Sequence, residues 1–335
     1  MHFALLGMDE EALAFADALV ADGRHQLTSV MGCSAPPFAP AAKSQPDLEE
    51  ILADPAIELV VVGSAIGERG EHLRRAVQSE CDVICAVPCA KSIELVYETA
   101  VVQAETKKVL LPLLPFAIHP RIAQLRSEIR SPITLIKWDL PGSTDGKGFA
   151  GWTELRRLGG EITEVTAVEI ATLPGAPNSM LITGRFENQG MFQVSVDPTH
   201  STERLVVQTK EGAHTSDTKS ESVAAMWRPF VEEYESQRSG GQPKLSWQDA
   251  VRHHELSDAM KRSLEKRRTE SLDNQEVSAE SASKGTLTLI GCGMIWLIVL
   301  IFGISIWVPW IRWAVVPILI GFLGLVLVRA LGRRV

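Results

Sequence analysis

The chain has 335 residues, which is long enough for two domains, and it carries a formal net charge of −8. This acidic balance, with no basic stripe, argues against a nucleic-acid-binding protein. The five cysteines are odd in number and lie in apolar sequence, which argues against a disulfide framework. No metal site is predicted, because the segment that holds Cys81, Cys85 and Cys89 reads as a strand followed by Pro88, so the three would not share a helical face.

The stretch from Phe3 to Val20 predicts a strand, a tight turn and a helix. A dinucleotide-binding turn of this kind reads G-x-G-x-x-G, and here the three positions hold Gly7, Asp9 and Ala12. The carboxylate of Asp9 replaces the glycine that lets the backbone approach a pyrophosphate. We therefore expect weak or absent dinucleotide binding.

Further strands alternate with helices up to Ile129, which is typical of a doubly wound parallel sheet. The expected strands are Gln26–Met31, Ile57–Gly63, Asp82–Val87 and Val109–Leu114. A Rossmann unit often carries a carboxylate at the end of its second strand, but here Gly32, Cys33 and Ser34 follow Met31. Residues 1–130 are thus predicted to form an α/β domain of the Rossmann type that lacks this acid.

The pattern changes after Ser131, where short strands joined by turn residues predict an antiparallel sheet. The expected strands are Ile133–Leu140, Glu164–Thr172, Met180–Phe186, Met191–Val196 and Leu205–Thr209, and helices follow at Val223–Gln237 and Ser246–Arg268. Residues 131–266 are therefore predicted to form an α+β domain. His253 and His254 are expected on a solvated helix face.

A polar segment over 267–286 is predicted to be a flexible linker. Two apolar stretches within 287–331 then predict a pair of transmembrane helices in contact with the lipid bilayer. Flanking arginines favour a cytoplasmic location for both termini and for the α/β body. No leader is expected, because Met1 runs straight into the first strand.

Several stretches in the same order resemble the Gfo/Idh/MocA family of NAD(P)-dependent sugar oxidoreductases. Asp54–Val62 is similar to the family's "DPDIDAVVIAT", and Asp82–Pro88 stands where the family has "HVLCEKP". Phe116–Arg126 resembles "RRFDPAVRRLR", and Leu158–Val165 and Gly240–Arg252 resemble later segments. The resemblance covers Met1 to Arg268. It implies NAD(P) as cofactor, bound near Gly7, Asp9, Ala12, Gly32 and Gly63.

The expected catalytic groups of that family are missing. Its E-K-P tripeptide, which holds the catalytic lysine, is here Ala86, Val87 and Pro88. Its D-x-G-x-H-x-x-D element is replaced by Gly151–Arg157, which contains no histidine. Two further residues, Lys91 and His119, are the remaining candidates for moving the hydroxyl proton.

These departures favour a membrane-anchored, catalytically degenerate homologue that acts as a binding or scaffolding module. The alternative is an active NAD(P)-dependent oxidoreductase that acts on a sugar or related polyol. Whether the chain is an enzyme, and whether it pairs with a second copy or another partner, stays open at this point.

Overall fold

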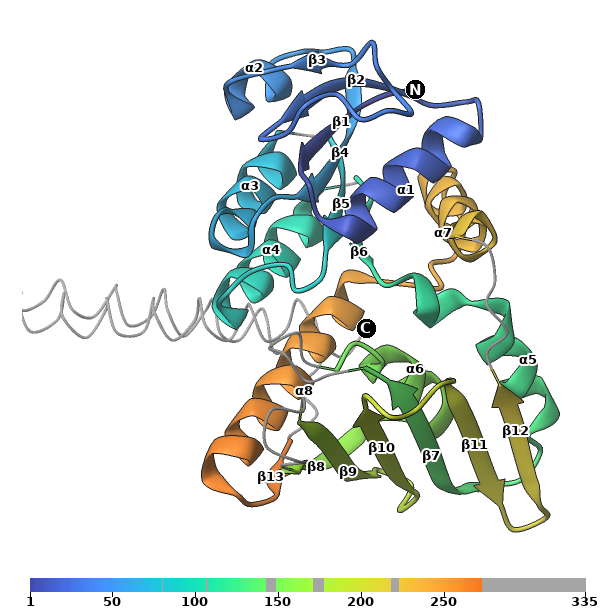
Figure 1. Ribbon diagram of the computed structural model, residues 1–335. Helices are drawn as coiled ribbons and strands as arrows, with labels where there is room; N and C mark the ends of the chain where they lie inside the picture. The colour runs from blue at the N-terminus through green and yellow to red at the C-terminus, as the bar shows by residue number, and fades with distance from the viewer. Residues whose placement is uncertain (80, 107, 143–148, 171–177, 218–222, 273–335) are drawn as a thin grey trace, which may run out of the picture. The chain divides into compact units, whose positions relative to one another are not determined.

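A parallel six-stranded sheet forms the first half of the described fold (Figure 1). The structure is a computed structural model that describes residues 1–272 except 80, 107, 143–148, 171–177 and 218–222. The sheet has the order β3-β2-β1-β4-β5-β6. Its strands are β1 (His2–Gly7), β2 (Gln26–Met31), β3 (Lys43–Ser44), β4 (Ile57–Gly63), β5 (Asp82–Ala86) and β6 (Leu110–Leu113). The order reverses between β1 and β4, and that is where ligands bind in open α/β sheets.

Helices cover both faces of this sheet (Figure 1). The helices α1 (Glu10–Ala21) and α7 (Val223–Arg238) lie together on one face, and α3 (Ile66–Gln78) and α4 (Ile93–Glu105) lie on the other. The short helix α2 (Leu48–Leu52) precedes β4. Because both faces are covered, β4 reads as an almost continuous apolar run, and every residue of it except Glu58 is buried.

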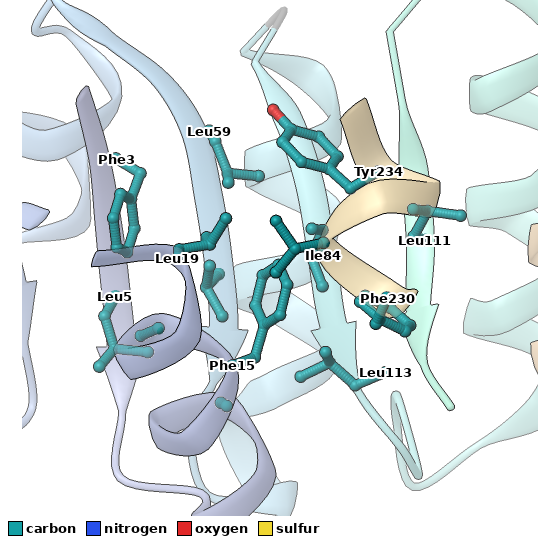
Figure 2. Close-up of a cluster of buried hydrophobic side chains, with 14 of the residues drawn as sticks. Phe3, Leu5, Phe15, Leu19, Leu59, Ile84, Leu111, Leu113, Phe230 and Tyr234 are labelled. Carbon is teal, nitrogen blue, oxygen red and sulfur yellow. The ribbon is translucent and has the colours of Figure 1, made fainter. Parts of the chain in front are cut away.

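The core beneath α1 joins distant parts of the sequence (Figure 2). Phe15 of α1 meets Phe230 of α7 edge to face, with ring centroids 5.2 Å apart. Both pack with Ile84 and other sheet residues in one buried cluster. An edge-to-face aromatic pair of this kind contributes about 1 kcal/mol beyond its area burial. Helix α7, which comes late in the sequence, therefore covers part of one face of the first sheet.

The second sheet is mixed, so the prediction of an antiparallel sheet is wrong in one pairing. Its order is β12-β11-β7-β10-β9-β8-β13, and β7 pairs with β10 in parallel. The strands are β7 (Ile133–Pro141), β8 (Ile162–Ile170), β9 (Ser179–Phe186), β10 (Met191–Asp197), β11 (Arg204–Thr209), β12 (Ala213–Asp217) and β13 (Glu270–Ser271). Helices that pack against this sheet are α5 (Pro120–Glu128), α6 (Trp152–Gly159) and α8 (Trp247–Lys266).

Strand β13 falls inside residues 267–286, which the sequence assigned to a flexible linker. There the chain pairs with β8 instead, through Glu270 opposite Val165 and Ser271 opposite Glu164. The described residues belong to one compact unit that contains both sheets. The first sheet and the helices of the second half therefore share one body.

The predicted membrane hairpin over 287–331 lies outside the described residues. Within the part of the chain that the structure describes, no helix combines the length and the apolar character needed to span a bilayer. The lipid partner and the cytoplasmic location stay predictions.

Candidate functional site

A cavity of about 460 Å³ opens where the strand order reverses, at the carboxyl ends of β1, β2 and β4. Eleven residues line it: Gly7, Met8, Asp9, Met31, Gly32, Gly63, Ser64, Ala65, Glu68, Arg69 and His72. Four of the five predicted cofactor-binding residues are among them. The fifth, Ala12, lies in α1 behind the wall of the cavity. A Cβ added to Gly63 would lie 2.5 Å from the Cβ of Ala12.

Glycines make the wall of this cavity. Gly7 has φ +86°, and a Cβ there would lie 2.4 Å from the carbonyl oxygen of Gly63. No other residue fits at Gly7 without moving β1 away from β4. Gly32 has φ +70° and faces open space, since the nearest atom to an added Cβ is the Cα of Gly7 at 3.9 Å. The ends of three strands therefore present backbone to a ligand.

Asp9 caps helix α1 from inside the cavity. Its Oδ1 accepts hydrogen bonds from the backbone N–H groups of Glu11 at 3.1 Å and Ala12 at 3.4 Å. These are donors that a helix start offers to a phosphate. The carboxylate of Asp9 therefore lies where an anion would bind at this helix start.

Arg69 balances that carboxylate, and the sequence analysis missed it. Its side chain is buried, and Nη2 donates to Asp9 Oδ2 at 2.7 Å. The other guanidinium nitrogens donate to the carbonyl oxygens of Ser64 at 2.9 Å and Pro88 at 3.0 Å. One guanidinium therefore links the α1 turn, the end of β4 and the turn after β5.

Two other polar side chains of the cavity come from the same segment of the chain. Ser64 Oγ lies 2.6 Å from Nδ1 of His72, within hydrogen-bond distance. Burial lowers the pKa of His72, with a smaller opposing effect from Glu68. His72 is therefore neutral near pH 7.

The predicted positions Ala86, Val87 and Pro88 lie at the end of β5 and in the turn that follows it. This turn contacts the second half of the fold. The Val87–Pro88 peptide bond is cis. The next residue, Cys89, donates its backbone N–H to Nε2 of His254 at 3.0 Å. Ala86 is buried and Val87 is half-buried, so this turn places no ionisable side chain of its own at the family's lysine position.

His253 and His254 are buried, so the expectation of a solvated face is wrong. Burial lowers the pKa of His254 to about 4 and that of His253 to about 3. Both rings are neutral near pH 7, as the acceptor role of His254 requires. The pattern missed this because helix α8 packs against the first sheet as well as its own, so two of its faces are covered.

The two candidate proton carriers lie in different places. Lys91 is exposed, and its Nζ is 3.6 Å from the position that a Cβ would take on Gly67, next to the cavity residue Glu68. His119 caps helix α5, where its Nδ1 accepts the backbone N–H of Arg121 at 3.2 Å. Lys91 therefore lies beside the cavity wall, and His119 lies at a helix start outside its lining.

Glu154 is a further ionisable residue that the sequence analysis passed over. It lies on α6, in the segment that replaces the family's second proton-handling element, and it is 3% exposed. Burial raises the pKa of its carboxyl group to about 7, against the opposing charges of Arg157 and Arg121. Its Oε2 accepts no hydrogen bond within the described residues. It is a buried acid that titrates near neutral pH.

The Glu154→Gln variant is expected to lose a pH dependence of stability. The raised pKa means that the folded chain binds this proton more tightly than the unfolded chain, for which 4.5 is the ordinary value. The free energy of unfolding therefore falls between about pH 4.5 and pH 7, by about 3 kcal/mol in total. Urea unfolding of the full chain at about pH 5 and about pH 8 measures this difference. Equal pH dependence in the parent and the variant would contradict the assignment.

Among the described residues, no group of three or more His, Cys, Asp or Glu side chains is arranged to hold a metal ion.

No protein-family model and no curated protein matches this chain. Solved structures do match. A myo-inositol dehydrogenase from Lactobacillus casei, in complex with NAD(H) and myo-inositol, has a TM-score of 0.71 at 15% identity, over 83% of this chain and 98% of that one. A myo-inositol dehydrogenase from Corynebacterium glutamicum has 0.69 at 17%, over 82% and 99%. A scyllo-inositol dehydrogenase from L. casei with NAD(H) and scyllo-inositol has 0.68 at 12%, over 81% and 98%.

At these identities the likeness establishes the fold, and it supports the resemblance to Gfo/Idh/MocA oxidoreductases at that level. It also corrects the functional prediction. The interpretation as a catalytically degenerate binding or scaffolding module is wrong, because the matching structures are dehydrogenases, two of them holding NAD(H). The alternative, an active oxidoreductase, fits them better.

Proposed function

We propose that this chain is an NAD(P)-dependent oxidoreductase that acts on a sugar or related polyol. The observation that carries the proposal is the cavity at the switch point, whose wall includes Gly7, Gly32 and Gly63 and so presents backbone where a dinucleotide would lie. Its volume of about 460 Å³ lies in the range of small-molecule sites. The inositol dehydrogenases that share the fold support the choice of a cyclic polyol as substrate.

The residues present fit the adenosine half of such a cofactor. The first mononucleotide-binding half of a doubly wound sheet is built on its first strands, and the cavity is lined by the ends of β1 and β2. Met8, which is 60% exposed, and Met31 offer polarizable apolar surface to a base. The pyrophosphate would lie at the start of α1, beside Asp9 and Arg69.

Asp9→Gly is expected to strengthen NAD binding about tenfold. The change frees the N–H groups of Glu11 and Ala12, removes a negative charge and leaves the Arg69 guanidinium free to pair with phosphate. Isothermal titration of the full chain with NAD measures the gain. In the matched variant Asp9→Asn the charge goes but the side-chain acceptor stays, so a smaller gain is expected. Weaker binding by Asp9→Gly would identify Asp9 as a ligand-binding group instead.

Bound nicotinamide supplies the hydride acceptor, so the chain has to supply a group that takes the proton of the substrate hydroxyl. Ala86 and Val87 have no such group. We propose Lys91 for this role because it lies in the segment between β5 and α4, three residues past Pro88 and outside the lining of the cavity assigned to the adenosine half. His119 is the second candidate, although its Nδ1 is already used as a helix cap.

The direct test is nicotinamide reduction by the full chain. The protein is mixed with NAD or NADP and with myo-inositol, scyllo-inositol or an open-chain polyol, and the absorbance of the reduced cofactor is followed. Reduction that requires folded protein, cofactor and polyol together is the expected result. A chain that binds neither cofactor and reduces none with any polyol would rule the proposal out.

A further inference from the structure

We infer that Glu68 takes over the role of the missing carboxylate after β2, binding the hydroxyl pair of the adenosine ribose and selecting NAD over NADP. The inference rests on the proposed function, because it assigns a residue to one part of the proposed cofactor. It concerns a side chain of α3, a helix from the other half of the doubly wound sheet.

The need for such a residue comes from β2. That strand ends at Met31, and Gly32 leaves open space where a Rossmann unit places its ribose-binding side chain. The residues that follow, Cys33 and Ser34, carry no charge near pH 7, and burial raises the pKa of the Cys33 thiol further. The second strand therefore provides no carboxylate to bind a diol.

Glu68 provides one from across the same cavity. It lies in the first turn of α3, is exposed and lines the cavity together with Met31 and Gly32. Within the described residues its carboxylate makes no hydrogen bond or ion pair, whereas Asp9 is bound by Arg69 and the start of α1. Of the two carboxylates that line the cavity, Glu68 is the one available to a ligand.

The chemistry of that carboxylate discriminates between the two cofactors. Two carboxylate oxygens can accept hydrogen bonds from two neighbouring hydroxyl groups, as in the ribose of NAD. A 2′-phosphate would remove one donor and bring negative charge against Glu68. The only arginine or lysine in the cavity lining is Arg69, whose guanidinium is bound to Asp9 and two carbonyl oxygens, and His72 is neutral near pH 7.

Calorimetric titration of the full chain with NAD and with NADP tests the inference. The parent is expected to bind NAD at least about tenfold more tightly than NADP, in line with the worth of hydrogen bonds to a charged group. Glu68→Gln should weaken NAD about tenfold, leave NADP the same or tighter, and so remove the preference. Glu71→Gln is the matched control, because Glu71 lies on the same helix outside the cavity lining and should leave both affinities unchanged.

The outcomes separate the two claims. Equal affinity of the parent for both cofactors, or an unchanged ratio in Glu68→Gln, overturns the role of Glu68 while the cofactor site stands. Binding of neither cofactor to the parent overturns the proposed function and this inference together. Thermal melting of each variant verifies that an altered affinity does not come from loss of the fold.

Discussion

Lys91→Ala is expected to lower kcat for polyol oxidation by about two to four orders of magnitude, the usual contribution of a positioned acid–base group. The turn after β5 offers no other ionisable side chain at the family's lysine position, because Ala86 and Val87 are apolar. The dissociation constant for NAD should change little, since Lys91 lies outside the cavity lining. Steady-state kinetics with separate calorimetric titration distinguish the two effects.

Lys108→Ala is the control for this prediction. Lys108 is an exposed lysine that borders a different cavity, together with Asp82 and Arg238. Its loss removes the same charge from the chain without touching the proposed site, so kcat should stay at the parent value. Full activity in Lys91→Ala would transfer the proton-accepting role to another residue, and His119→Ala would then be the next variant to measure.

Arg69→Met is expected to lower the free energy of unfolding by about 3 kcal/mol. The variant keeps the length of the side chain but leaves Asp9 without its ion pair and two carbonyl oxygens without their donor. Breaking a buried pair costs about 3–5 kcal/mol, and the partial exposure of Asp9 places this case at the low end. Urea unfolding of the full chain measures the loss.

The matched variant is Arg75→Met on the same helix. Arg75 pairs with Glu71 and Glu49 on the exposed surface, where such pairs are worth at most about 1 kcal/mol. A loss in Arg69→Met no greater than in Arg75→Met would show that Arg69 does not anchor the three segments that it contacts.

The first half of the fold could be predicted because its signals are local. Consecutive residues indicate both the strand and turn at Gly7 and the apolar run of β4. The second sheet was harder, because the parallel pairing of β7 with β10 joins residues more than fifty positions apart. Strand β12, with the polar sequence AHTSD, carries no apolar alternation that would reveal it.

The start of α3 explains why most of the cavity's polar residues were missed. Helix α3 begins at Ile66, but glycines at 67 and 70 weaken the helical pattern of its first two turns. Gly70 is a glycine for a packing reason, since a Cβ there would lie 3.1 Å from side-chain atoms of Ala90 and Leu95. These turns include Glu68 and Arg69, which line the cavity.

The glycine positions of the site could be predicted from the sequence. The side-chain contacts that form between distant residues could not. The positions of Gly7, Gly32 and Gly63 follow from the ends of three predicted strands, and the structure brings them together. The ion pair of Asp9 with Arg69 spans sixty residues, so no local pattern announces it. The sequence showed an unneutralised acid, whereas the folded chain holds a balanced pair, and that difference weakens the argument from Asp9 against a cofactor.

Titration of the full chain with NAD, followed by calorimetry and by the thermal unfolding temperature, shows whether the chain binds a dinucleotide at all. We expect saturable binding at one site per chain, with an unfolding temperature that rises with the NAD concentration, because a ligand that binds the folded state alone stabilises it. No heat of binding and no rise in the unfolding temperature at millimolar NAD or NADP, about the weakest affinity that would be useful for an enzyme of this kind, would contradict it.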